Sequence, residues 1–186
     1  MSMAECKQAV LVEKETAHRD CLTGCYDRMT IRHLVDLCFL KSDVRQSHAM
    51  FVIDVDNFKR VNDTWGREFG DIVLNDVAAV LRRIFRRSDY IGRIGDDEFL
   101  VLLRDVEPER LSEKKAQEFY TALGTLFSAR GDERYKPTCS VGIARYPMDG
   151  TLFETVFQSA DAALHEAKRL GLNRVAFARG CEGRKR

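Results

Sequence analysis

Three consecutive carboxylates stand out in the sequence because of the chemistry they could support. Asp96, Asp97 and Glu98 lie between two short apolar runs, YIGRI and FLVLL, within the stretch 89–103. Such runs are typical of strands, and Gly95-Asp96 is a pair that closes a β-hairpin because both residues accept a positive φ. A tight hairpin would gather the three carboxylates at one tip, where their repulsion is costly unless a cation neutralises it. A metal site is therefore one interpretation, and from this stretch alone an exposed acidic turn is the simpler one.

A second pair of acids follows the apolar run 50–53, at Asp54 and Asp56. A continuous apolar run predicts a central strand that is covered on both faces, and the end of such a strand is a common place for chemistry in α/β proteins. We expect Asp56 to be the N-cap of a short helix over 57–62. We expect Asp54 to be functional, because a second acid beside a cap only adds repulsion. The N-terminus of this helix, with Lys59 in its first turn, would suit a phosphate next to a metal ion held by Asp54.

The remaining hydrophobic pattern predicts the elements that bring these acids together. Apolar residues at spacings of three and four predict helices after Asp27, over about 71–86, from Pro108 and over about 151–169. The segments 138–144 and 174–178 read as strands. This order predicts an α/β protein of the α+β type, with a ferredoxin-like core of an antiparallel sheet and flanking helices. In that fold Asp54 and Asp97 can lie side by side, forming an oxygen-rich site suited to Mg²⁺ carrying nucleotide phosphates.

Length and composition predict one globular domain. A chain of 186 residues with 45% hydrophobic content can bury a core, and a net charge of +1 gives no reason to expect a nucleic-acid partner or contact with an acidic membrane. No apolar run approaches the ~20 residues of a membrane span, so we expect a cytoplasmic domain whose parent protein could still be membrane-anchored. The six cysteines lack zinc-site spacing and are expected to be reduced. We expect a connecting helix over 1–18, the domain over 19–178 and a disordered tail over 179–186.

Six motifs occur in one register along the chain. They are DCLTGCYDR, DVDNFKRVNDTWG, GD at 70–71, RIGDDEF, SVGIA and ADAALHEAKRLGLN. Their order and spacing, from about residue 16 to 178, resemble the GGDEF family of diguanylate cyclases. That family makes cyclic di-GMP from two GTP molecules and releases pyrophosphate, and its fold resembles the nucleotidyl cyclase catalytic core and the polymerase palm. The resemblance implies a homodimer, because each domain would hold one GTP, and an upstream sensory domain if the chain is a fragment.

The resemblance also implies roles for individual residues. Asp54, Asp97 and Glu98 would be the catalytic acids, and Asp54, Asp97 and the Val55 carbonyl would bind Mg²⁺ or Mn²⁺. The implied GTP contacts are Asn57, Phe58, Lys59, Asn62, Asp71, Gly95 and Lys168. Asn62 and Asp71 would read guanine, since a carboxylate accepts from guanine N1–H and N2–H₂, whereas adenine would leave the charge unpaired. The bound metal would assist attack of one GTP 3′-OH on the α-phosphorus of the other.

A product-inhibitory site is implied by Arg86 and Asp89, which reproduce the family's RxxD motif six residues before Gly95. The arginine fork would donate to guanine O6 and N7, and the aspartate would accept from the N–H edge. A charged helix end is the alternative interpretation. The register to the hairpin favours the functional one.

Four positions depart from the family pattern: Asp96 replaces the second glycine, His165 a tyrosine, Leu172 an arginine and Arg67 a histidine. Asp96 matters most, because a like charge within ~4 Å of the triphosphate costs on the order of 1 kcal/mol in water and more when partly buried. Activity would then be weakened or lost. The alternative function is therefore a catalytically degenerate domain that acts as a receptor for cyclic di-GMP or GTP. A cyclase with another product is disfavoured by the guanine-reading residues.

Overall fold

The computed structural model describes residues 17–43, 45–106, 108–129 and 137–179, without the side chains of 108–111 and 127–129. The predicted connecting helix and the predicted tail therefore lie outside the described residues, apart from 17–18 and 179. Residues 17 and 18 are not helical.

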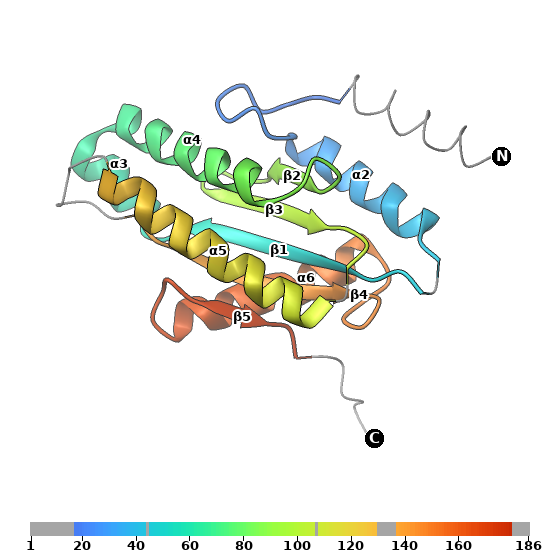
Figure 1. Ribbon diagram of the computed structural model, residues 1–186. Helices are drawn as coiled ribbons and strands as arrows, with labels where there is room; N and C mark the ends of the chain where they lie inside the picture. Colours follow the sequence, from blue (N-terminus) through green and yellow to red (C-terminus); the bar gives the residue numbers. More distant parts are fainter. Residues whose placement is uncertain (1–16, 44, 107, 130–136, 180–186) are drawn as a thin grey trace.

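The centre of the fold is a five-stranded sheet in the order β2-β3-β1-β4-β5 (Figure 1). Its strands are β1 (His48–Val55), β2 (Tyr90–Arg93), β3 (Glu98–Leu103), β4 (Cys139–Tyr146) and β5 (Val175–Phe177). β1 is antiparallel to both β3 and β4, β2 and β3 form the predicted hairpin, and β5 runs parallel to β4. The predicted ferredoxin-like core is confirmed, with β5 added as a parallel edge strand. β1 is buried along its whole length, as the apolar run 50–53 predicted.

Helices cover both faces of the sheet, which explains the continuous apolar run in β1 (Figure 1). Phe51 and Ile53 point into a core formed with α3 (Phe58–Trp65), α4 (Arg67–Ile84) and α5 (Pro108–Ala129). Met50 and Val52 point to the opposite face, where they pack with α2 (Arg28–Lys41) and α6 (Phe153–Arg169). Alternate side chains of a strand face opposite sides, so one strand serves both cores.

The region between α3 and α4 differs from the sequence prediction. α3 continues to Trp65 and α4 begins at Arg67, so 63–70 is not a loop but two helix ends that meet at Gly66. Gly66 has φ 85°, a value that glycine adopts at no steric cost, and it can therefore break the helix in a single residue. The apolar spacing of this segment would place Ile72 in the buried stripe of α4, but Ile72 is 41% exposed, whereas Val73 and Leu74 are buried.

Close packing of α6 on β4 explains Gly142. A Cβ at this position would lie 2.0 Å from the Ala160 carbonyl oxygen and 2.3 Å from the Leu164 nitrogen, so only glycine allows the contact. A glycine inside a strand often marks a close backbone approach of this kind. Asp27 caps α2 as predicted, with the Thr30 N–H donating to its Oδ1 at 2.8 Å.

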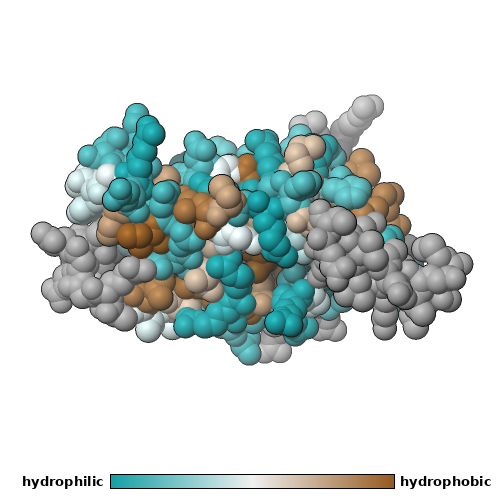
Figure 2. Space-filling model, turned by 90° about the horizontal axis from the view of Figure 1, so that it is seen from above, coloured by the Kyte–Doolittle hydropathy of each residue, from teal (hydrophilic) through white to brown (hydrophobic). Residues whose placement is uncertain are grey.

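The surface seen from above is mainly hydrophilic, with hydrophobic residues in separate groups (Figure 2). Scattered exposed hydrophobic residues of this kind are usual in globular proteins. Within the described ranges, no helix has both the length and the apolar character needed to span a bilayer.

Candidate functional site

The end of β1 and the start of β3 bring the predicted acids together. Asp54 and Glu98 are partners in the β1–β3 register, and the Val55 N–H donates to the Asp97 carbonyl oxygen at 3.1 Å. Three carboxylates that come from two distant parts of the sequence therefore share one end of the sheet. This juxtaposition agrees with the arrangement predicted for Asp54 and Asp97.

The hairpin turn has a different geometry from the one expected. Residues 94–97 separate β2 from β3, and the N–H groups of Ile94 and Gly95 both donate to the Glu98 carbonyl oxygen, at 2.9 and 3.4 Å. Neither Gly95 nor Asp96 is among the residues with a positive φ, so that expectation is wrong. A four-residue loop can reverse the chain through ordinary right-handed conformations. Asp96 consequently adopts this turn without left-handed strain, and its effect on the site comes from its charge.

The pKa values of the three acids are all raised, first of all by burial. Burial, followed by the charges of Asp54 and Glu98, raises the pKa of Asp97 to about 6. Burial also raises the pKa of Asp54, although Lys168 opposes the shift. Burial and then the charge of Asp54 raise the pKa of Glu98. Burial therefore makes each carboxylate harder to ionise, the charge of Asp54 adds to this effect at Asp97 and Glu98, and a bound cation would relieve all three.

Lys168 brings a positive charge to the cluster from the last turn of α6. Its Nζ lies 2.7 Å from Oδ2 of Asp54. The predicted triphosphate contact and the predicted metal ligand are thus direct neighbours. An ammonium group at this point can balance part of the carboxylate charge and can also meet a phosphate oxygen.

The chemistry of the donor set fits Mg²⁺ or Mn²⁺. Carboxylate oxygens of Asp54 and Asp97 and the carbonyl of Val55 are hard ligands, and Mg²⁺ commonly uses one or two carboxylates together with substrate phosphates and water. In the part of the chain that the structure describes, no group of three or more His, Cys, Asp or Glu side chains is arranged to hold a metal. The predicted metal ligands are only two side chains, those of Asp54 and Asp97, together with the Val55 carbonyl. They are therefore compatible with the absence of a three-residue group in the described part of the chain.

Asp56 is not the helix cap that the sequence suggested. It is buried and accepts hydrogen bonds from Thr138 Oγ1 at 2.7 Å, Ser140 Oγ at 2.7 Å and the Asn173 N–H at 2.9 Å. The N-cap of α3 is Asn57, with φ 56° and no side-chain capping bond. Asp56 instead joins the end of β1 to β4 and to the loop after α6. The partners are more than eighty residues away in sequence, so local spacing gave no sign of them.

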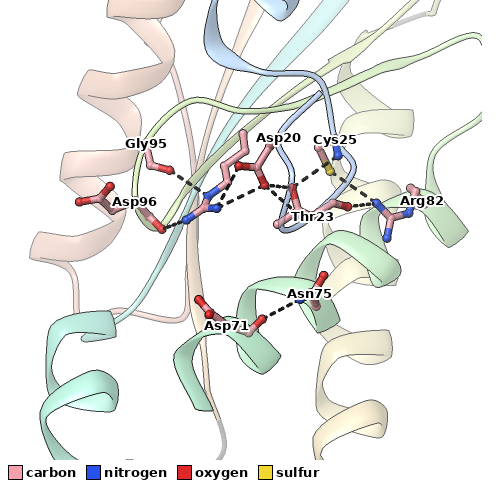
Figure 3. Close-up of polar contacts among 9 residues, drawn as sticks. Asp20, Thr23, Cys25, Asp71, Asn75, Arg82, Gly95 and Asp96 are labelled. Atoms are coloured by element: carbon pink, nitrogen blue, oxygen red, sulfur yellow. Dashed lines mark hydrogen bonds and ion pairs between the residues drawn. The ribbon is translucent and has the colours of Figure 1, made fainter. Parts of the chain in front are cut away.

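The predicted guanine-reading residues lie on adjacent helices. Asn62 is on α3 and Asp71 is exposed on α4, where the Asp71 carbonyl accepts from Asn75 Nδ2 at 3.0 Å (Figure 3). The Asn62 Oδ1 is buried and lacks a hydrogen-bond partner in the described structure. A Cβ at Gly70 would lie 2.0 Å from that oxygen, so glycine leaves room for the amide. A buried acceptor without a partner is unusual and is consistent with a ligand donor at this position.

At the start of α3, the predicted phosphate contacts differ in exposure. Asn57 and Lys59 are exposed, whereas the Phe58 side chain is buried in the core, leaving only its backbone N–H as a candidate contact. These residues follow directly after β1 and therefore lie next to Asp54 and Val55.

Arg86 and Asp89 form a turn beside a pocket rich in arginine. Asp89 is buried, with Oδ2 accepting from the Arg86 N–H at 2.8 Å and Oδ1 from the Arg104 N–H at 3.2 Å. Its carboxylate therefore has a structural role, which the sequence did not reveal. Arg86 is exposed and lines a pocket of 270 Å³ together with Asp89 and further arginines, namely Arg19, Arg82 and Arg87. A pocket of this composition is suited to an anionic ligand with hydrogen-bonding edges.

Comparison with known proteins identifies relatives over nearly the whole chain. A family model described as "Diguanylate cyclase, GGDEF domain" matches residues 17–174. The probable diguanylate cyclase DgcT of Escherichia coli (strain K12) is 32% identical over 171 residues, covering 90% of this chain and 37% of that protein. The cyclic di-GMP phosphodiesterase PdeR of the same organism is 34% identical over 155 residues, covering 83% of this chain and 23% of that protein. The chain thus spans well under half the length of these curated relatives.

Solved structures with the same fold include a diguanylate cyclase and a further GGDEF domain. SiaD of Pseudomonas aeruginosa, solved with its activator SiaC, has a TM-score of 0.79 and 31% identity, covering 94% of this chain and 67% of that chain. The coiled coil and GGDEF domain of DgcB from Caulobacter crescentus, solved with c-di-GMP, has a TM-score of 0.77 and 25% identity, covering 92% and 91%. These matches agree with the mixed α/β fold described above.

Proposed function

Because this chain belongs to the diguanylate cyclase GGDEF domain family, we propose that it condenses two GTP molecules into cyclic di-GMP and releases pyrophosphate. The observation that carries the proposal is the cluster of Asp54, Asp97 and Glu98, whose pKa values are all raised where β1 and β3 meet. An oxygen-rich cluster with excess negative charge, close to a helix N-terminus and to Lys168, is suited to a metal–triphosphate complex.

In the proposed complex, Asp54, Asp97 and the Val55 carbonyl hold Mg²⁺ or Mn²⁺. The phosphates lie over the N–H groups of Asn57 and Phe58. Lys59, Lys168 and the backbone at Gly95 complete their surroundings. When bound by these residues, the metal would supply positive charge to the transferring phosphoryl group and would lower the pKa of the attacking 3′-OH. The residues proposed here lie on β1, in the turn between β2 and β3, at the start of α3 and on α6.

In the proposed reaction, the 3′-oxygen of one GTP forms a bond to the α-phosphorus of the other. The bond from that phosphorus to the pyrophosphate oxygen breaks, and the proton of the 3′-OH passes to the carboxylate network that includes Glu98. A second, equivalent step closes the cyclic product. Since each domain holds one GTP, two copies of the chain must face each other, and we propose a homodimer as the active form.

The proposed selectivity for guanine rests on Asn62 and Asp71. The Asp71 carboxylate accepts from guanine N1–H and N2–H₂, and the Asn62 amide, whose Oδ1 has no described partner, supplies a further polar contact. Adenine lacks the N2 amino donor and presents no N1–H, so it would leave the carboxylate unpaired.

We also propose regulation by the product at Arg86 and Asp89. The arginine-lined pocket suits the guanine edges and phosphates of cyclic di-GMP. A ligand there lies apart from the metal-binding acids, so it would act by linking domains into an arrangement in which the two half-sites do not face each other. We further propose that the chain is part of a longer protein with an upstream sensory domain. We also propose that this domain is cytoplasmic.

The second candidate function is a receptor module that binds cyclic di-GMP or GTP without turnover. Asp96 favours it, because this exposed carboxylate adds negative charge next to Asp97. It is also favoured by the match to PdeR, which is named a phosphodiesterase rather than a cyclase. The intact arginine-lined pocket would then be the main functional site.

One experiment separates the two functions. The purified chain is incubated with GTP and Mg²⁺ and the products are analysed by mass spectrometry, with Asp54→Asn as the matched inactive variant. Cyclic di-GMP made by the wild type and not by the variant supports the cyclase. Tight binding of cyclic di-GMP or of GTP without any product supports the receptor. Absence of both product and nucleotide binding contradicts both.

A further inference from the structure

The turn that carries Asp97 is held by one arginine. Arg93, the last residue of β2, donates from Nε to the Gly95 carbonyl oxygen at 3.1 Å and from Nη2 to the Asp96 carbonyl oxygen at 2.8 Å. Its Nη1 donates to Oδ1 and Oδ2 of Asp20, both at 3.2 Å (Figure 3). One guanidinium group thus binds two successive carbonyls of the turn and a carboxylate from the start of the domain.

Asp20 is itself fixed by its own turn. Its Oδ1 accepts from the Thr23 N–H at 2.8 Å and from Thr23 Oγ1 at 2.6 Å, and its N–H donates to the Cys25 carbonyl oxygen at 2.9 Å. Burial raises the pKa of Asp20, but the Thr23 hydrogen bonds and the Arg93 charge outweigh it and lower the pKa. Asp20 is therefore a preorganised anchor for Arg93.

The Arg93–Asp20 pair is shielded from solvent. The two side chains are 17% and 20% exposed. An ion pair of this kind is screened less by salt than an exposed one, and a guanidinium fork fixes the direction of each bond. The two carbonyls that Arg93 binds immediately precede Asp97, so their orientation sets the path of the backbone into that residue.

The segment 20–25, which contains Asp20 and Thr23, also contacts α4, the helix that carries Asp71. Arg82 of α4 donates from Nη1 to the Thr23 carbonyl oxygen (Figure 3). The segment 20–25 therefore binds the hairpin on one side and α4 on the other. A shift of this segment would move Asp97 relative to α4 and its proposed guanine-reading residue, Asp71.

We propose that Arg93 and Asp20 form a positioning pair for the metal site: Asp20 anchors Arg93, and Arg93 holds the turn 94–97 in the conformation that presents Asp97. The proposal rests on the proposed function and deepens it. It makes the geometry of the metal site depend on the segment 20–25, at the point where the chain enters the domain. A movement imposed on that segment would thus be transmitted to Asp97 without passing through the core.

The test compares Arg93→Ala, Arg93→Lys, Asp20→Asn and the double variant Asp20→Asn/Arg93→Ala with the wild type. Mn²⁺ binding is titrated by electron paramagnetic resonance in the presence of a non-hydrolysable GTP analogue, and kcat and KM for GTP are measured in parallel. Loss of a group that positions a metal ligand typically costs about 10–100-fold in metal affinity or activity, and we expect this for Arg93→Ala. Arg93→Lys keeps the charge but not the fork, so it should recover only part of the loss. The double variant should bind Mn²⁺ no more weakly than Arg93→Ala, because Asp20 acts through Arg93 and its contact with Arg93 is already lost in that variant.

Arg145→Ala is the matched control. Arg145 Nε lies 2.9 Å from Oδ2 of Asp149, and these side chains are 12% and 1% exposed, so this pair is at least as shielded as the Arg93–Asp20 pair. Arg145 is opposite Ala49 in the β1–β4 register, at the other end of β1 from Asp54. Its loss should lower the melting temperature as much as Arg93→Ala does while leaving Mn²⁺ affinity unchanged. Melting temperatures of all variants are recorded to separate stability from positioning.

Amide hydrogen exchange provides a measurement that does not require activity. The Val55 N–H is bonded to the Asp97 carbonyl oxygen, so it reports on the turn directly. Asp20→Asn, the milder variant, should accelerate exchange at Val55 and Gly95, whereas Arg145→Ala should not. Unchanged exchange in Asp20→Asn, or unchanged Mn²⁺ affinity in folded Arg93→Ala, overturns the proposal. If the wild type neither binds Mn²⁺–GTP nor makes product, the proposed function fails, and the exchange result alone still decides whether the pair holds the turn.

Discussion

Lys168 and Asp54 form an ion pair, with Nζ of the lysine 2.7 Å from Oδ2 of the aspartate. The pair joins the last turn of α6 to the end of β1, so it brings a cation from the C-terminal part of the chain to the acids near the middle. Lys168 lowers the pKa of Asp54, Asp97 and Glu98, while burial raises each of them. A lysine in this position has two opposite effects on the proposed ligands: it attracts a phosphate and competes with a metal ion.

Replacing Lys168 should therefore change the two affinities in opposite directions. In Lys168→Met, Mn²⁺ binding without nucleotide should become tighter, because a competing positive charge has left the carboxylates. GTP affinity should fall by at least about tenfold, since charge-assisted hydrogen bonds contribute about 1.5–3 kcal/mol. Calorimetric titrations with Mn²⁺ and with Mg²⁺–GTP measure both. Weaker binding of both ligands would mean that Lys168 supports the site only structurally.

Stability of the metal-free protein should depend on pH through Asp97. Its pKa is about 6 in the folded protein, against an ordinary value of 3.8. Between these values the folded state binds more protons than the unfolded state, so the free energy of unfolding falls as pH rises from about 4 to about 6. The contribution of protonated Asp97 to the free energy of unfolding is fully present below pH 3.8 and is lost above about pH 6.

Asp97→Asn isolates this effect from those of other carboxylates. The difference in unfolding free energy between wild type and variant, measured by urea denaturation with chelator at several pH values, should change across that window and be flat above it. Saturating Mg²⁺ should reduce the pH dependence of the wild type, since the cation stabilises the ionised carboxylate. A difference that does not vary with pH would show that Asp97 titrates normally in the folded protein.

Asp96 should impair activity through its charge and not through its backbone. Because its φ is not positive, replacing it by glycine relieves no left-handed strain. Asp96→Asn and Asp96→Gly should consequently raise the rate of cyclic di-GMP formation to a similar extent, of the order of tenfold at most if a like charge costs about 1 kcal/mol. Initial rates are measured at several Mg²⁺ concentrations, because added cation should narrow the difference. If only the glycine variant gains activity, backbone conformation is the cause.

The comparison of sequence and structure shows which inferences local patterns can support. The sequence predicts the strand that leads to Asp54 and the hairpin that contains Asp97, because burial and turns leave signals in neighbouring residues. Asp56 was misassigned because its partners come from β4 and the loop after α6. Arg93 and Asp20 are 73 positions apart, and neither has a local pattern that marks an ion pair. Side-chain networks between distant elements depend on the tertiary fold and are therefore the part of the site that sequence reasoning missed.

Arg86 and Asp89 should differ in what their loss does, although both belong to the RxxD motif. Arg86 is exposed beside the pocket, so Arg86→Ala should weaken cyclic di-GMP binding at least about tenfold while leaving GTP binding and the melting temperature unchanged. Asp89 is buried and accepts from two backbone N–H groups, so Asp89→Asn should also destabilise the fold, by about 1–3 kcal/mol.

Calorimetry with cyclic di-GMP and with GTP, together with thermal unfolding of both variants, distinguishes these roles. Arg83→Ala, at the end of α4 just before this turn and outside the residues that line the pocket, is a suitable control for the loss of an exposed arginine. Equal affinity for cyclic di-GMP in the wild type and in Arg86→Ala would mean that this turn is only a charged helix end. The proposal that this pocket is the receptor site for cyclic di-GMP would then lose its support, because the motif arginine would not contribute to binding.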